Sequence, residues 1–252
     1  MQWILEAIGV RKNFGALQAV AGADFRLERG QITMLIGPNG SGKTTFINIV
    51  SGLYKPDAGV IIYNGTEIQG YPPHKIYDTG LVRTFQVPLA FVKLTVLENL
   101  LVAYRRNRGE SFLHAPLRRT WLKQEEMITE LAFDVMLKLK LDHLWDERSS
   151  NLSGGQFKLL EIGRALMSGA KTILMDEPVS GINPALAHEV LQHIKNLREQ
   201  LGITFLLVEH RLDIALPYVE YLYAMDKGKV ITHGAPDKVV SDPRVIESYL
   251  GG

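Results

Sequence analysis

The sequence predicts an α/β fold with a mainly parallel sheet, together with an antiparallel β subdomain and an inserted α-helical subdomain. Short apolar runs alternate with helical segments, which is typical of parallel strands covered by helices. The pair Asn64-Gly65 directly follows the apolar run 60–63 and favours a tight hairpin turn. Residues 88–167 are mostly helical in pattern, so they interrupt the alternation as an insertion would.

The individual elements follow from local pattern. Apolar runs bounded by Gly or charged residues predict buried strands, and the run that ends in a Gly-rich turn should be followed at once by a helix that stops near Gly52. The predicted strands are 4–10, 23–27, 32–36, 60–63, 172–175, 203–208, 221–225 and 229–232, and the predicted helices outside the insertion are 44–50 and 185–199. We expect a single domain over residues 1–252, with the core and β subdomain in 1–87 and 168–252 and the helical subdomain in 88–167.

The composition limits the possible functions. A chain of 252 residues can bury a sizeable core, and its net charge of +1 argues against a nucleic-acid partner. The absence of cysteine excludes disulfides and thiolate metal sites. No apolar run approaches the roughly 18 residues that a membrane span needs, and the N-terminus does not have the pattern of a signal peptide. We therefore expect any membrane role to operate through a partner or a surface.

A phosphate-binding loop is the first motif that carries chemistry. Its residues, with the threonine that follows, are Gly37, Pro38, Asn39, Gly40, Ser41, Gly42, Lys43, Thr44 and Thr45. The glycines let backbone N–H groups turn towards phosphate oxygens, and the helix that follows points the positive end of its dipole at the same anion. Lys43 supplies charge to the β- and γ-phosphates, and the Thr44 hydroxyl suits Mg²⁺. The alternative is an incidental lysine in a Gly-rich turn, which the strand–helix setting disfavours.

Two carboxylates end the apolar strand 172–175. Asp176 is expected to help hold Mg²⁺, and Glu177 to orient or deprotonate the attacking water. Phosphoryl transfer needs these two tasks done by separate groups. Solvated acids at a strand end are the alternative.

The segment Leu152–Gln156 opens a predicted helix. Ser153 is a good N-cap, and Gln156 three residues later completes a capping box. A well-made helix start would explain these two residues, but Gly154 and Gly155 weaken a first turn. They are explained if an anion approaches the backbone closely. Since the chain has one phosphate-binding loop, this second site would serve the nucleotide of another copy.

With this pentapeptide the sequence resembles the ABC ATPase family over essentially its whole length, with the family's motifs in order. The loop 37–44 matches Walker A, and residues 173–177 match Walker B. The resemblance implies that Gln86 is the Q-loop residue that contacts Mg²⁺, that His210 contacts the γ-phosphate, and that Phe14 stacks on adenine. Asn183 departs from the pattern, because the family usually has Asp there. Asn keeps a hydrogen-bonding side chain but removes a charge.

The resemblance also implies ATP hydrolysis at the cytoplasmic face of a membrane. Two ATPase subunits, identical or paralogous, would close around two ATP molecules, each nucleotide lying between Lys43 of one subunit and Ser153 and Gly155 of the other. Transmembrane permease subunits would be direct partners and an extracytoplasmic binding protein an indirect one. The segments 80–86 and 208–213 are similar to those of branched-chain amino acid importers. Urea or amide importers, a lipid exporter ATPase, a soluble ABC ATPase and a small-molecule P-loop kinase are the alternatives.

Two surfaces remain open to interpretation. The apolar residues 88–94 offer a docking surface for a membrane subunit, or they pack within the helical subdomain. The basic stretch 105–123 is a solvated loop, or it faces anionic lipid or an acidic partner.

Overall fold

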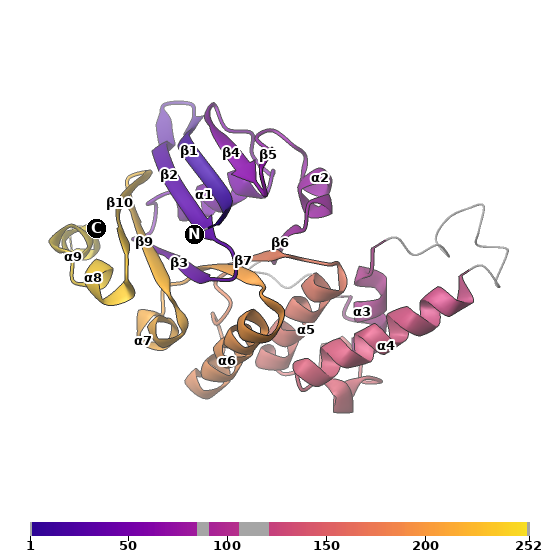
Figure 1. Cartoon of the computed structure of the whole chain (residues 1–252). Helices are drawn as coiled ribbons and strands as arrows, with labels where there is room; N and C mark the ends of the chain where they lie inside the picture. Colours follow the sequence, from indigo (N-terminus) through magenta and orange to yellow (C-terminus); the bar gives the residue numbers. More distant parts are fainter. Residues whose placement is uncertain (1, 85–90, 106–120, 251–252) are drawn as a thin grey trace. The chain divides into compact units, whose positions relative to one another are not determined.

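The computed structural model describes residues 2–84, 91–105 and 121–250 (Figure 1). Internal contacts divide the chain into two compact units. The core unit comprises Met1–Gln86, Lys171–Ser180 and Ile194–Gly252, and the helical unit comprises Val87–Ala170 and Gly181–His193. The helical unit thus takes in residues 181–193, which lie beyond the helical subdomain expected at 88–167.

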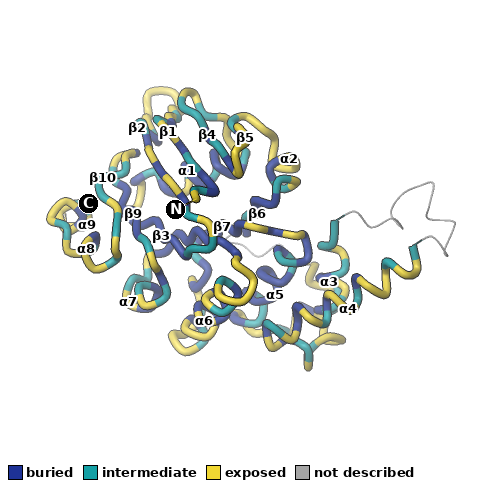
Figure 2. Tube along the Cα trace, in the orientation of Figure 1, coloured by how far each residue is buried: buried dark blue, intermediate teal, exposed yellow. Residues whose placement is uncertain are grey.

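A six-stranded sheet in the order β10-β9-β3-β8-β7-β6 is the larger sheet of the core unit. Its strands are β3 (Ile32–Ile36), β6 (Leu81–Thr84), β7 (Thr172–Asp176), β8 (Thr204–Val208), β9 (Tyr221–Asp226) and β10 (Lys229–Gly234). All neighbours pair in parallel except β9 and β10. Every residue of β3, β7 and β8 is buried, because both faces of these strands are covered. The trace of β3 is accordingly dark blue in Figure 2. The predicted parallel sheet is confirmed.

An antiparallel sheet of order β2-β1-β4-β5 completes the strands of the core unit. It contains β1 (Trp3–Phe14), β2 (Leu17–Glu28), β4 (Ala58–Tyr63) and β5 (Thr66–Glu67). β1 and β2 are longer than predicted because register shifts and exposed positions break the apolar alternation along them. Asn64 and Gly65 both have positive φ, so the predicted hairpin turn is confirmed.

The helix α1 (Lys43–Val50) packs between these sheets in a shared hydrophobic core. Phe46 of α1 meets Phe25 of β2, whose ring lies 4.2 Å from that of Tyr223 in β9. This packing fixes the phosphate-binding loop, which connects β3 to α1. The shorter helices of the core unit are α2 (Pro73–Asp78), α7 (Leu212–Ala215), η5 (Leu216–Tyr218), α8 (Pro236–Val240) and α9 (Pro243–Leu250).

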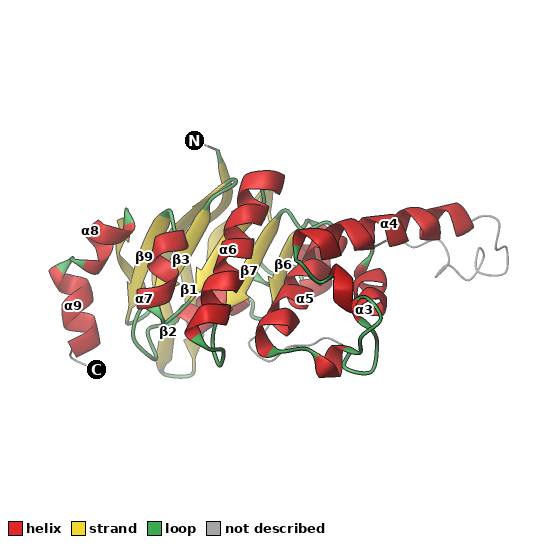
Figure 3. Cartoon of the chain, turned by 90° about the horizontal axis from the view of Figure 1, so that it is seen from below, coloured by secondary structure: helices red, strands yellow, loops and turns green. Residues whose placement is uncertain are grey.

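The helical unit is built on α3 (Val96–Ala103), α4 (Leu122–Lys138) and α5 (Gly154–Met167), which Figure 3 labels, together with the short helices η3 (Asp142–Leu144) and η4 (Ser149–Asn151). Thr95 and Glu98 form a capping box that starts α3. The fully buried amide of Asn99 hydrogen-bonds the backbone of Phe91 and Thr95. Helix α6 (Pro184–Leu201) begins in this unit and continues into the core unit. None of the helices that the structure describes is long and apolar enough to cross a bilayer.

Candidate active site

The phosphate-binding loop leaves β3 and enters α1 through a residue that must be glycine. Gly42 is the N-cap of α1 with φ of 101°. A Cβ atom there would lie 2.4 Å from the carbonyl oxygen of Ala19, well inside contact distance. The helix therefore begins at Lys43, with Thr44 exposed and Thr45 half-buried on its first turn. This arrangement places hydroxyl and N–H groups at the mouth of the loop.

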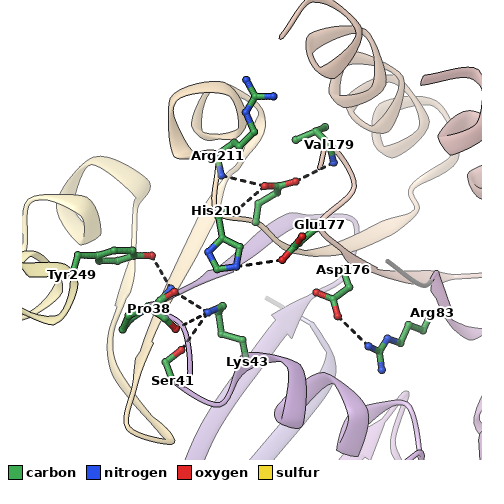
Figure 4. Close-up of polar contacts among 12 residues, drawn as sticks. Pro38, Ser41, Lys43, Arg83, Asp176, Glu177, Val179, His210, Arg211 and Tyr249 are labelled. Atoms are coloured by element: carbon green, nitrogen blue, oxygen red, sulfur yellow. Dashed lines mark hydrogen bonds and ion pairs between the residues drawn. The ribbon is translucent and has the colours of Figure 1, made fainter. Parts of the chain in front are cut away.

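Lys43 is folded into its own loop. Its Nζ donates to the carbonyl oxygens of Gly37 at 2.7 Å and Pro38 at 2.9 Å (Figure 4). The side chain is only 5% exposed as a residue, and this burial lowers its pKa, whereas the nearby carboxylates of Asp176 and Glu177 raise it. The ammonium is thus a partly desolvated charge whose electrostatic interactions are stronger than in bulk water.

Asp176, the last residue of β7, forms a buried ion pair. Its Oδ2 lies 3.0 Å from Nη2 of Arg83 in β6, and the two side chains are 7% and 8% exposed. Arg83 Nη1 donates in addition to the side chain of Asn48 in α1. Burial lowers the pKa of Arg83, while Asp176 raises it. The carboxylate proposed for Mg²⁺ is therefore oriented by a guanidinium on the neighbouring strand.

Glu177 and His210 meet beyond the strand ends. The Oε1 of Glu177 lies 3.4 Å from Nε2 of His210, as the dashed line in Figure 4 marks. Glu177 has φ of 52°, a left-handed conformation that is uncommon for a side chain of this kind. Its N–H donates to the carbonyl of Val208, which ties the end of β7 to the end of β8. Strained backbone of this sort clusters at functional sites.

Glu209 is a site residue that the sequence analysis missed. Its buried carboxylate accepts backbone N–H bonds from Val179 at 3.0 Å, His210 at 2.8 Å and Arg211 at 3.1 Å. It therefore joins the loop after β7 to the loop after β8 and positions His210. The available signal was a charged residue directly after the run 203–208, because a charged side chain at the end of a buried strand is fully buried only when it is paired.

The segment Ser153–Gln156 lies in the helical unit. Ser153 accepts from the Gln156 N–H and Gln156 Oε1 accepts from the Ser153 N–H, so the predicted capping box is confirmed. A Cβ on Gly154 would lie 2.9 Å from Cγ2 of Ile182, which gives this glycine a packing reason besides anion approach. Gly155 is buried but has ordinary space towards Leu186.

The other expected residues are spread over the chain. Phe14 ends β1, is 43% exposed, and makes an edge-on contact of 5.3 Å with Tyr54. Asn183 caps α6, since its Oδ1 accepts from the Leu186 N–H at 2.9 Å, a role that Asn and Asp fill equally well. Gln86 lies outside the described residues, as do 88–90 of the apolar segment and 106–120 of the basic stretch.

The donor set of the core unit suits a nucleotide with Mg²⁺. Mg²⁺ is usually held by one or two protein oxygens, with phosphate and water completing the shell. Thr44 in α1 offers one hydroxyl and Asp176 at the end of β7 offers one carboxylate, and the described residues contain no group of three or more His, Cys, Asp or Glu that would hold a metal alone. The residues therefore fit a metal that arrives with phosphate.

Comparisons with known proteins agree with this chemistry. A family model described as "ABC transporter" matches residues 20–180, and one described as "Branched-chain amino acid ATP-binding cassette transporter" matches residues 229–252. A probable branched-chain amino acid transport ATP-binding protein of Archaeoglobus fulgidus is 49% identical, covering 98% of this chain and 95% of the relative. The high-affinity branched-chain amino acid transport ATP-binding protein of Escherichia coli is 33% identical, covering 99% and 98%.

Solved structures point the same way. A nucleotide-free ATP-binding cassette from an ABC transporter superposes with a TM-score of 0.86 at 44% identity over 100% of both chains. The ADP conformation of a cassette of an ABC transporter gives 0.87 at 43% identity, again over 100% of both chains. The family model covers more than half of the chain, and the relatives cover nearly all of it. This chain belongs to the ATP-binding cassette family of ABC transporters.

Proposed function

We propose that this chain binds and hydrolyses ATP with Mg²⁺ and thereby powers a membrane transporter that imports branched-chain amino acids. One observation carries the chemical part of the proposal. The core unit brings Lys43, Asp176, Glu177 and His210 together at the phosphate-binding loop. The carboxylates of Asp176 and Glu177 interact electrostatically with the Lys43 ammonium. The cargo is proposed only from likeness to branched-chain amino acid transport proteins, in the names of the relatives and in the family model at residues 229–252, because cargo does not touch this subunit.

The residues of the core unit divide the reaction between them. Lys43 exchanges its loop carbonyls for β- and γ-phosphate oxygens, and the loop residues 37–42 and Thr45 bind the phosphates through backbone or hydroxyl groups. Thr44, Asp176 and Gln86 would hold Mg²⁺, which neutralises phosphate charge when bound. Phe14 provides a ring face for adenine.

Glu177 is placed to act on water. Its carboxylate orients a water molecule for attack on the γ-phosphate and accepts the proton that leaves it. His210, 3.4 Å away, holds that carboxylate on one side and reaches the γ-phosphate on the other. Glu209 fixes the His210 backbone, so the two side chains keep their spacing while the phosphate leaves.

A second ATPase subunit, identical or paralogous, completes the site in this proposal. Ser153, Gly154, Gly155 and Gln156 of one subunit face the nucleotide held by the other, so ATP favours the closed dimer because it contacts both subunits only there. The dimer lies at the cytoplasmic face of the cell membrane as a peripheral component. Its direct partners are the transmembrane permease subunits, and an extracytoplasmic binding protein delivers the cargo to them.

The replacement Glu177→Gln tests the reaction and the dimer together. This variant should bind ATP, lose hydrolysis by about a hundredfold or more, and elute as a dimer by light-scattering chromatography with ATP and Mg²⁺. The same variant with ADP should remain monomeric. Glu177→Gln combined with Ser153→Ala is the matched control, and it should dimerise more weakly. A Glu177→Gln protein that stays monomeric with ATP, or that still hydrolyses it at the wild-type rate, contradicts the proposal.

The transport part needs a separate experiment. Co-purification with the permease subunits of a branched-chain amino acid importer, followed by leucine uptake into proteoliposomes loaded with ATP, should succeed with the wild-type chain and fail with Glu177→Gln. Uptake of urea but not leucine would support the proposed role in an importer and would show that the proposed cargo is wrong. Failure to bind any membrane subunit would favour a soluble ATPase.

A further inference from the structure

The C-terminal helix α9 contacts the phosphate-binding loop. The hydroxyl of Tyr249 accepts a hydrogen bond from the backbone N–H of Gly37 at 2.9 Å, as Figure 4 shows. The two residues are 212 positions apart in the sequence, and both belong to the core unit. Tyr249 lies outside residues 20–180, which match the general family model, and inside residues 229–252, which match the model of branched-chain amino acid cassettes.

Gly37 is held from two directions. Its N–H donates to Tyr249, and its carbonyl oxygen accepts from Lys43 Nζ at 2.7 Å. Gly37 is also tightly seated against β9, because a Cβ on it would lie 2.1 Å from the carbonyl oxygen of Met225. A phenol on one side and an ammonium on the other therefore fix one residue at the entrance of the loop.

Tyr249 is 40% exposed as a residue, so its side chain is only partly shielded from water. This partial burial raises the pKa of the phenol, although the Gly37 N–H lowers it. Gly37 itself is buried. Loss of the phenol oxygen would leave the buried N–H of Gly37 without its acceptor. An unsatisfied buried donor destabilises the loop conformation that contains it.

We propose that Tyr249 is a positioning residue for the nucleotide site. Through Gly37 it holds the first turn of the phosphate-binding loop in the conformation that places Lys43, and so it raises the affinity for nucleotide phosphates. The physical reason is preorganisation, because a loop that is already ordered loses less entropy when the ligand binds. This inference rests on the proposed nucleotide binding, and it assigns a role to α9 that the reaction itself does not need.

The replacement Tyr249→Phe removes one oxygen atom and keeps the ring. ADP with Mg²⁺, measured by isothermal titration calorimetry, should bind about three- to tenfold more weakly, which is the effect of one net hydrogen bond. In ATP hydrolysis KM should rise by a similar factor while kcat stays within about twofold, because Tyr249 touches no reacting atom. Tyr221→Phe is the matched control. It also deletes a phenol oxygen of the core unit, one that lies 2.8 Å from Nδ1 of His233, and ADP affinity should be unchanged.

Amide hydrogen exchange, measured without nucleotide, tests the contact independently of the proposed function. The Gly37 amide should exchange at least about threefold faster in Tyr249→Phe and at the wild-type rate in Tyr221→Phe. Unchanged Gly37 exchange overturns the inference, and so does wild-type ADP affinity in Tyr249→Phe. A fall in urea midpoint without a change at Gly37 also overturns it, because that result assigns Tyr249 to general stability. A wild-type protein that binds no ADP contradicts the proposed function instead, while Gly37 exchange still reports on the contact.

Discussion

Replacing Arg83 with methionine should destabilise the core unit more than any single surface substitution. The Arg83 and Asp176 side chains are 8% and 7% exposed, and their charged atoms lie 3.0 Å apart. Removing one partner of a buried ion pair leaves an uncompensated charge and costs about 3–5 kcal/mol. Exposed ion pairs contribute only about 0–1 kcal/mol, so the two cases are well separated.

The assay is urea unfolding with EDTA present, followed by far-UV circular dichroism. Arg83→Met should lower the free energy of unfolding by about 3–5 kcal/mol. The double variant Arg83→Met with Asp176→Asn should recover part of this loss, because no buried charge is then left unpaired. If Arg83→Met costs less than about 1 kcal/mol, the pair behaves as a solvated one and the reasoning about Asp176 is refuted.

Two further predictions concern packing and pH. Gly154→Ala should lower the free energy of unfolding by about 1–3 kcal/mol, because the new Cβ meets Ile182. The double variant Gly154→Ala with Ile182→Ala should lose less than the sum of the two single variants. Additive losses would contradict the steric explanation. Burial raises the pKa of Tyr223 to about 12. Above the unfolded value of about 10, the unfolded chain holds fewer protons, so stability falls as pH rises towards 12. Urea midpoints between about pH 9.5 and 11 should fall less steeply for Tyr223→Phe than for wild type, and equal slopes would refute the assignment.

The strands and loops that follow local rules were predicted well from sequence. β3 was placed correctly at both ends, and β7 and β8 within one residue, because a strand buried on both faces is a continuous apolar run. The Asn64-Gly65 turn and the Ser153–Gln156 capping box also depend on residues close in sequence. The interactions that form these features are between residues close in sequence, so the sequence pattern alone is enough to predict them.

The missed features depend on contacts between distant residues. β6 went unassigned because Arg83 interrupts its apolar pattern, and the partner that makes this charge tolerable is Asp176, 93 positions away. The same holds for Glu209, whose burial is explained by the N–H of Val179, and for Tyr249, whose hydroxyl meets Gly37. No short pattern marks such residues, since each is an ordinary polar side chain until the fold brings its partner to it. The roles expected for the site residues, Phe14, Gln86 and Ser153 among them, stay predictions.

Glu209 has a mechanical consequence for the cassette. Its carboxylate accepts hydrogen bonds from the backbone of two loops. A backbone shift at His210 or at Val179 therefore breaks one of these bonds or displaces the other loop. The chain passes from the core unit into the helical unit between Ser180 and Gly181, which follow Val179 in the sequence. In the proposed function, His210 would respond to the departing phosphate by rotating its imidazole ring, because a shift of its backbone would also displace the segment that leads to α6. Glu209 therefore joins the backbone at His210 to the segment by which the chain leaves the core unit.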